Sequence, residues 1–385
     1  MKINLKKLLY SGVTLMSLGV LAACSSTSSS TTTASSAATS QTSVATTSNN
    51  STSSDSSSSS IDWSALPTTE VTLSNDGLKI TEGGTYILTG STTAGVTVET
   101  DANVRIILAG AEISSSDTAA INVINADNVE LEIKDGTTNT VKDTSNHTDT
   151  NIEGAIHVEA DLTITGNGSL TVEGNFQDGI VSTDDLVVNS GNITVTAVDD
   201  GIRGKDSLTI NGGTINVTAG GDGIKSTNDT DTTKGYTTIT GGDITVKAGD
   251  DAIKAETALT IDGGTITVPE SVEALEGTNI TINGGTIDVY GSDDAINASS
   301  TTSSDIYIKV TGGDLKVAVG SGDTDAFDAN GDIYISGGTI AVTAPTSAFD
   351  FDGTAELTGG TVTVNGEQIT QIVATGPGAG GHGGW

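Results

Sequence analysis

The sequence predicts an all-β fold, a solenoid of the parallel β-helix type with about 22 residues in each coil. Three observations predict it. Gly-Gly turns recur through the chain, and each is followed by a short run in which Ile or Val alternates with Thr, Asn or Asp. Apart from the N-terminal leader, no segment has the apolar period of a long helix. The composition is rich in glycine (49 residues) and poor in proline (4) and aromatics (3%).

The repeat is clearest in Gly212–Val217, Gly241–Val246 and Gly263–Val268. Most copies follow one another at intervals of about 22 residues, and a few intervals are longer by a short insertion. The copies begin at Ser190, Gly212, Gly241, Gly263, Gly284, Gly312, Gly337 and Gly359. A β-propeller blade needs roughly 40–50 residues, and a β-sandwich needs no regular repeat. Stacked coils place like residues in rows, which explains how a hydrophobic content of 35% fills a narrow core.

Residues 1–24 read as a targeting segment. Lys2, Lys6 and Lys7 precede the apolar run Leu8–Leu21, and Cys24 follows two alanines. This ending resembles a bacterial lipoprotein signal, in which the cysteine becomes the lipidated first residue. An ordinary signal peptide that retains a cysteine is the alternative. We expect lipidation at Cys24 and a location on the extracellular face of the cell membrane, with the lipid as the only membrane contact.

Three further segments follow. Residues 25–60 are almost entirely Ser, Thr, Ala and Asn, which predicts a disordered tether. Residues 61–375 carry the repeats and are expected to form the β-helix domain. Residues 376–385 are glycine-rich and are expected to be a disordered tail.

The charge balance excludes one class of partner. The chain has 49 Asp and Glu against 15 Lys and Arg, a formal charge of −34. A nucleic acid held by a basic surface is therefore not expected. The single cysteine also excludes a disulfide framework.

Aligned repeats stack one acidic position, and we call this set the acid column: Asp178, Asp200, Asp222, Asp251, Glu273, Asp294 and Asp325. The preceding position adds a second acid at Asp199, Asp250 and Asp293. Carboxylates one coil apart lie within about 5 Å of one another, so they must be neutralised or repel. Ca²⁺ accepts six to eight oxygen ligands and suits this arrangement. The alternative is a solvated acidic edge. The predicted calcium ligands are Asp199, Asp200, Asp222, Asp250, Asp251, Asp293, Asp294 and Asp325.

Basic residues stand three positions after some of the column acids, at Arg203, Lys225 and Lys254. Ion pairs with neighbouring acids are the first interpretation. The alternative is a uronate lyase, in which a metal acidifies a sugar proton and a base removes it.

The few aromatic residues add two predictions. Phe327 and Phe349 fall among the inward residues and are expected in the core. Tyr307 and Tyr334, with Arg203, are the candidate sugar-binding residues. The two tyrosines occupy matching outward positions in Ile-Tyr-Ile segments, either as a platform for sugar rings or as a ladder within the sheet.

The phrases Asp199-Asp200-Gly201-Ile202-Arg203, Gly221-Asp222-Gly223-Ile224-Lys225 and Asp250-Asp251-Ala252-Ile253-Lys254 resemble a bacterial extracellular carbohydrate-binding family. Its fold is a pectate-lyase-like, right-handed, single-stranded parallel β-helix. The resemblance implies calcium along the helix and affinity for cellulose- or pectin-like glycans, without established lyase activity.

The sequence thus predicts a monomeric, lipid-anchored surface protein that binds polysaccharide through a calcium-binding β-helix, and it favours binding over catalysis. A calcium-dependent pectate-type lyase is the first alternative. A structural adhesin or spacer without a glycan ligand is the second.

Overall fold

The computed structural model describes residues 61–322 and 324–375. The predicted signal segment with Cys24, the tether and the tail lie outside the described residues. Within the described part, a single short 3₁₀ helix, η1 (Trp63–Ala65), precedes the strands. No helix there is long and apolar enough to cross a membrane.

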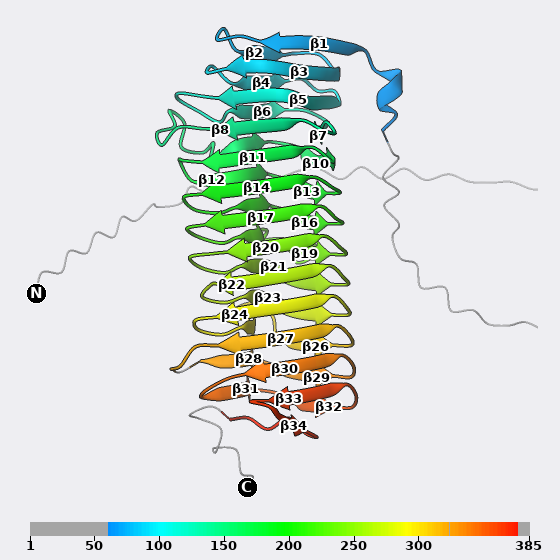
Figure 1. Ribbon diagram of the computed structural model, residues 1–385, viewed down its shortest axis with the longest axis vertical. Coiled ribbons are helices and arrows are strands. Elements are labelled where there is room, and N and C mark those ends of the chain that lie inside the picture. The colour runs from blue at the N-terminus through cyan, green and yellow to red at the C-terminus, as the bar shows by residue number, and fades with distance from the viewer. Residues whose placement is uncertain (1–60, 323, 376–385) are drawn as a thin grey trace, which may run out of the picture. The chain divides into compact units, whose positions relative to one another are not determined.

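The described residues form an all-β structure in one mostly parallel sheet, as the alternating pattern predicts. The strands stack along one axis in three rows, and the chain visits each row once per coil (Figure 1). Neighbours within a row are hydrogen-bonded in parallel, so equivalent residues of successive repeats lie side by side. Only β33 and β34 pair in the antiparallel sense among the described strands.

The first row contains β1 (Thr68–Leu73), β3 (Gly84–Thr92), β5 (Val104–Ser114), β7 (Asn128–Ile133), β10 (Asp161–Gly166), β13 (Asp185–Val188), β16 (Ser207–Ile210), β19 (Tyr236–Ile239), β21 (Ile253–Ile261), β23 (Leu275–Ile282), β26 (Tyr307–Val310), β29 (Asp332–Ile335) and β32 (Ala355–Leu357). The long strands β3 and β5 also extend into the second row, and β21 and β23 also form part of the third.

The second row contains β8 (Thr138–Lys142), β11 (Ser169–Gly174), β14 (Asn192–Ala197), β17 (Thr214–Ala219), β20 (Asp243–Lys247), β22 (Thr265–Glu270), β24 (Thr286–Gly291), β27 (Asp314–Val319), β30 (Thr339–Thr343), β33 (Thr361–Val364) and, after it, β34 (Glu367–Ile369). The third row contains β2 (Leu78–Ile80), β4 (Val96–Glu99), β6 (Ile121–Asn125), β9 (Gly154–Val158), β12 (Asp178–Ser182), β15 (Ile202–Gly204), β18 (Ile224–Ser226), β25 (Ile296–Ala298), β28 (Asp325–Ala329) and β31 (Ser347–Phe351).

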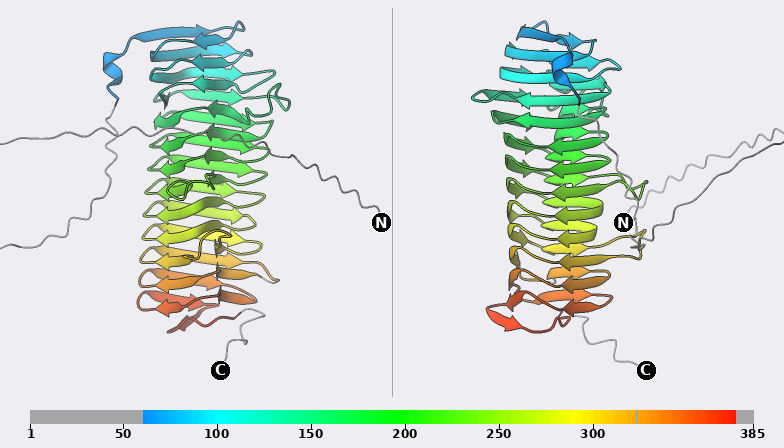
Figure 2. Two further views of the ribbon diagram at one scale, coloured as in Figure 1. Left: turned by 180° about the vertical axis from the view of Figure 1, so that it is seen from behind. Right: turned by 90° about the vertical axis from the view of Figure 1, so that its right-hand side faces the viewer.

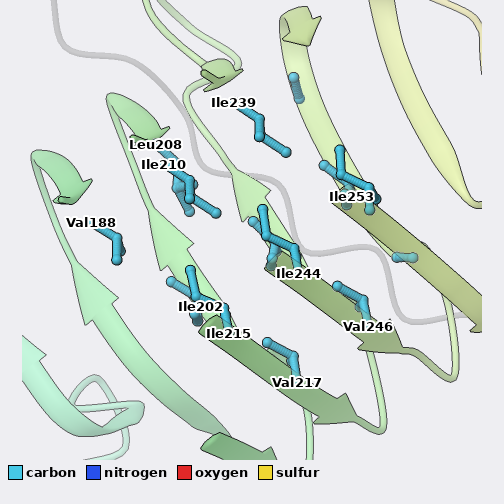
Figure 3. Packing of buried hydrophobic residues seen from close by; sticks show 14 of the residues in the cluster. Val188, Ile202, Leu208, Ile210, Ile215, Val217, Ile239, Ile244, Val246 and Ile253 are labelled. Atoms are coloured by element: carbon cyan, nitrogen blue, oxygen red, sulfur yellow. The ribbon is translucent and has the colours of Figure 1, made fainter. Parts of the chain in front are cut away.

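The core is a column of branched aliphatic side chains enclosed by the three rows (Figure 3). Ile215, Ile244 and Ile266 are in direct register and have no exposed surface. Successive strand residues point to opposite faces, so the aliphatic residues of a strand point into the core and most of its Thr, Asn and Asp residues alternate with them on the outside. Phe327 and Phe349 stack in the core with ring centroids 5.2 Å apart, which confirms their prediction.

The Gly-Gly turns are required by backbone geometry. At Gly264 the φ angle is +91°, in the region that side chains disfavour, and a Cβ atom would lie 3.0 Å from the carbonyl oxygen of Gly242 one coil earlier. The turns therefore stack on one another, and a side chain here would separate the coils.

Candidate functional site

The acid column exists as the repeat alignment predicts. The residue after a column acid donates its backbone N–H to the carbonyl of the next acid in five places: Gly179 to Asp200, Gly201 to Asp222, Gly223 to Asp251, Ala252 to Glu273 and Ala295 to Asp325. Column members are therefore one coil apart in register. They lie where the chain enters the strands of the third row.

Backbone hydrogen bonds occupy one oxygen of several column carboxylates. Oδ1 of Asp178 accepts from the backbone N–H of Asp200 at 3.1 Å, and Oδ1 of Asp200 accepts from that of Asp222 at 3.0 Å. The same contact joins Asp222 to Asp251 at 3.0 Å and Asp294 to Asp325 at 2.8 Å. These carboxylates thus satisfy backbone donors at the turn, a structural role that residue type and spacing did not reveal.

A second row of side chains runs beside the acid column, and we call it the mixed-charge row. Strand register aligns its members one per coil: Val181, Arg203, Lys225, Lys254, Glu276, Asn297, Asp328 and Asp350. After Val181 the row is basic for three coils, and Glu276, Asp328 and Asp350 then make it acidic, with the neutral Asn297 between them. Every member alternates with a buried neighbour, so all of them point to the same outer side.

The basic members pair with column acids, which confirms the predicted ion pairs. Arg203 contacts Asp178 at 2.8 Å and also pairs with Glu153. Lys225 lies between Asp200 at 2.6 Å and Asp222 at 3.0 Å.

Lys254 continues the same pattern one coil further on. It contacts Asp251 at 2.7 Å and pairs with Glu276. Each coil from Arg203 to Lys254 therefore carries its own counter-charge.

The ion pairs of Arg203 bear on its predicted role in sugar binding. Although burial opposes the charged form, Asp178 and Glu153 raise the pKa of the guanidinium. Its side chain is only 20% exposed. Arg203 is thus a structural cation held between two carboxylates, with little surface to offer a sugar or a reacting proton.

After Glu276 the mixed-charge row contains no basic residue. Burial is the largest cause of the raised pKa values of Asp294 and Asp328 in these coils. Burial, with the charges of Asp294, Asp325 and Asp350, raises the pKa of Asp328 to about 7. Burial raises the pKa of Asp294 to about 6 in spite of the N–H from Asp325, and Asp293 adds to the shift. These coils favour a bound proton or a cation.

Glu273 and Glu276 stand at the boundary between the two kinds of coil. Burial and the nearby Asp251 carboxylate raise the pKa of both side chains. The Asp251 carboxylate shares hydrogen bonds with the carboxyl groups of Glu276 and Glu273. Carboxyl groups this close together favour a shared proton or a cation between them.

Two groups of three carboxylates have oxygen atoms within 4.8 Å of one another: Asp178, Asp199 and Asp200, and Asp222, Asp250 and Asp251. Five of the eight predicted ligands therefore come together. Asp178 joins them although Gln177 precedes it, so the search for acid doublets did not find it. Asp293, Asp294 and Asp325 do not form such a group among the described residues.

The predicted match between Tyr307 and Tyr334 is wrong. Tyr307 lies beside Asn279 and Asp332, whereas Tyr334 lies beside Lys309 and Glu356. The sequence alignment paired Ile306 with Ile333, but the core pairs Ile308 with Ile333. Shifting the alignment by two residues leaves the same residues pointing outward. The alternation of apolar and polar residues therefore could not distinguish the two alignments.

Comparison with known proteins identifies the family. A family model described as "Carbohydrate-binding domain-containing protein" matches residues 74–326. This chain belongs to that family. A curated protein of the same description from Acetivibrio thermocellus is 33% identical over 135 residues, 33% of this chain and 47% of the relative. The match thus spans about half the length of that relative.

A solved structure is also similar. It is described as the polysaccharide lyase-like protein from C. thermocellum, a gadolinium derivative. It is 34% identical to this chain with a TM-score of 0.50, and the match covers 52% of this chain and 90% of that one. The likeness thus extends over most of the solved chain and about half of the present one.

Proposed function

We propose that this chain is a lipid-anchored surface protein that binds polysaccharide through a calcium-loaded, right-handed, single-stranded parallel β-helix. The observation that carries the proposal is the family match over residues 74–326, the same segment that contains both three-carboxylate groups. Cys24 is the proposed lipid attachment, residues 25–60 the tether, residues 61–375 the binding domain and residues 376–385 a disordered tail.

The donor set of the two groups fits calcium. Ca²⁺ takes six to eight oxygen ligands at flexible geometry, and an ionised carboxylate offers about four lone-pair sites, so the oxygens that already accept hydrogen bonds keep further capacity. Asp199 and Asp250 are exposed while their partners are buried. The solved relative is a gadolinium derivative, and Gd³⁺ is likewise a hard cation.

The exposed side of each group suggests how an acidic glycan binds. A domain with this excess of carboxylates repels polyuronates. Bound Ca²⁺ supplies positive charge and open coordination positions that a glycan carboxylate can fill. Asp199 and Asp250 would hold the ion at the exposed side of each group, while Arg203 and Lys225 pair with the buried acids.

A pull-down with insoluble polygalacturonate tests this proposal. We expect retention of the protein with millimolar Ca²⁺ and release in EDTA. The double variant Asp199→Asn/Asp250→Asn should lose retention, whereas Asp314→Asn, an exposed aspartate at the Gly-Gly side of β27, should keep it. Retention that is the same in EDTA would contradict calcium bridging.

A calcium-dependent lyase is the second candidate, because the solved relative is described as polysaccharide lyase-like. The ion pairs of Arg203 argue against it, since a base must be able to give up its proton near working pH. An absorbance assay for unsaturated uronate products with Ca²⁺ present decides between the two. Products that disappear in Arg203→Ala would establish the lyase.

A spacer or adhesin without a glycan ligand is the third candidate. It predicts no bound sugar on a glycan array, with or without calcium.

A further inference from the structure

A cleft of about 670 Å³ opens on the side of the stack, next to Lys254 and Glu276. Its walls are the loop between β18 and β19 and the loop between β25 and β26, and its floor is formed by β21 and β23. Its volume lies within the range of about 300–1,000 Å³ that ligand pockets occupy. The two loops project from one side of the stack (Figure 2).

The cleft follows from the unequal lengths of four consecutive repeats. The two long repeats, which begin at Gly212 and Gly284, carry the two loops. The two short repeats, which begin at Gly241 and Gly263, lie between them. In the short repeats the corner has no loop, because β21 and β23 run continuously through two rows. Two long loops thus flank two coils without one, which leaves a notch.

The walls are held in shape by their own hydrogen bonds. Asn228 Oδ1 accepts from the backbone N–H groups of Thr230 and Asp231, and its amide nitrogen donates to Asp206 at 2.6 Å. In the second loop, Ser300 Oγ accepts from the backbone N–H groups of Thr302 and Ser303. A binding site with a preformed wall loses less entropy when the ligand enters.

The lining is polar, acidic and contains one aromatic ring. One basic residue, Lys254, lines the cleft, and it already pairs with Asp251 and Glu276. The lining also contains four carboxylates, Asp229, Asp231, Glu256 and Glu276. Tyr236 stands at the edge of the cleft with 38% of its surface exposed. Carboxylates accept hydrogen bonds from hydroxyl groups and repel anions, and an aromatic face packs against the apolar face of a sugar ring.

We propose that this cleft binds a short stretch of a neutral, hydroxyl-rich glycan without calcium, while the acid column binds acidic glycans through calcium. The inference rests on the proposed function and assigns the neutral, cellulose-like glycans that the family resemblance implies to a second site. It moves the neutral-sugar contact from Tyr307 and Tyr334 to Tyr236. Sugar hydroxyls donate to Glu256 and the loop aspartates, and a uronate chain is rejected there.

Isothermal titration calorimetry in EDTA tests the inference with three neutral hexasaccharides, made of glucose, xylose or mannose. We expect at least one to bind, and Tyr236→Ala to weaken it at least tenfold. Tyr290→Ala is the matched control, because Tyr290 is 37% exposed on β24 and is not a lining residue of the cleft. It should change the affinity less than twofold.

A second variant guards against misfolding. Ala258→Trp places a large side chain on the floor and should abolish neutral-glycan binding at an unchanged melting temperature. Neutral-glycan affinity that survives both cleft variants overturns the inference. So does a wild-type protein that binds polygalacturonate with Ca²⁺ but none of the three hexasaccharides, and the proposed function then stands. A wild-type protein that binds no glycan of either kind overturns both.

Discussion

The coils from Arg203 to Lys254 and those from Glu276 to Asp350 share one backbone register but neutralise their buried acids differently. In the first, an ammonium or guanidinium group lies within hydrogen-bond distance of each column carboxylate. In the second, the equivalent row positions hold Glu276, Asn297 and acids, and burial raises the pKa of Glu276 and Asp328. Burial also raises the pKa of Asp178 in the first region to about 6 in spite of Arg203, whereas at Asp251 burial is outweighed by hydrogen bonds of Glu276, Glu273 and Lys254, which lower its pKa.

The difference teaches that the backbone ladder, not the counter-charge, sets the position of the acids. Asp294 accepts the backbone N–H of Asp325 as Asp200 accepts that of Asp222, with or without a lysine beside it. Asp178, Asp200, Asp222 and Asp294 each accept a backbone N–H from the next coil. Basic side chains of the mixed-charge row neutralise the acids in one region, and burial favours the protonated form of Asp294 and Asp328 in the other.

The largest loss of stability should come from removing a basic side chain that pairs with buried acids. Lys254→Ala leaves Asp251 and Glu276 close together without their shared ammonium group, and we expect a loss of about 2–3 kcal/mol, somewhat below the cost of breaking a fully buried pair because Lys254 is partly exposed. Urea unfolding in EDTA measures it.

Lys316→Ala is the control for that experiment. Lys316 pairs with Asp288 at 3.3 Å, but both side chains are largely exposed. Its loss should stay within about 0.5 kcal/mol. Equal effects of the two substitutions would show that the ion pairs of the basic coils do not differ from surface pairs.

The reciprocal experiment moves a cation into the acidic coils. Asn297 occupies the row position after Glu276, three residues from Asp294, as Lys254 is three residues from Asp251. Asn297→Lys should raise the unfolding free energy in EDTA by about 1 kcal/mol, because it supplies the acidic coils with a counter-charge. Asn216→Lys, on the exposed face of β17, should leave the unfolding free energy unchanged. A destabilised Asn297→Lys protein would mean that the two regions are not interchangeable.

The smallest effect is a dependence of stability on pH in the absence of divalent cations. The folded pKa values of Asp328 and Glu276, about 7 and about 8, lie above the ordinary values of 3.8 and 4.5. The folded state therefore binds more protons than the unfolded state between these limits, and its stability falls as pH rises.

Thermal melts in EDTA should show a melting temperature roughly 2–4 °C lower at pH 8 than at pH 5. Asp328→Asn should flatten that slope, and Asp314→Asn should not. A melting temperature that rises across the same interval would contradict the raised pKa values.

The structure could be predicted best from the sequence where the regular repeat determines which residues stack on one another. The register of Asp200 on Asp222 and the pairing of Lys225 follow from the regular step of the repeat, because identical spacing stacks identical residues. The backbone N–H that each aspartate accepts was not predicted, because residue identity does not reveal the backbone at a turn. The cleft was equally hidden, although the long, short, short and long repeats that build it are visible in the sequence. A loop's length does not say which way it projects.

The most direct test of calcium-dependent glycan binding is the affinity for soluble polygalacturonate, measured by calorimetry at millimolar Ca²⁺ and in EDTA. Wild-type protein should bind only with Ca²⁺, and Asp199→Asn/Asp250→Asn should weaken that binding at least tenfold at an unchanged melting temperature in EDTA. Equal affinity with and without Ca²⁺, or full affinity in the double variant, would contradict the assignment of calcium to these two carboxylate groups.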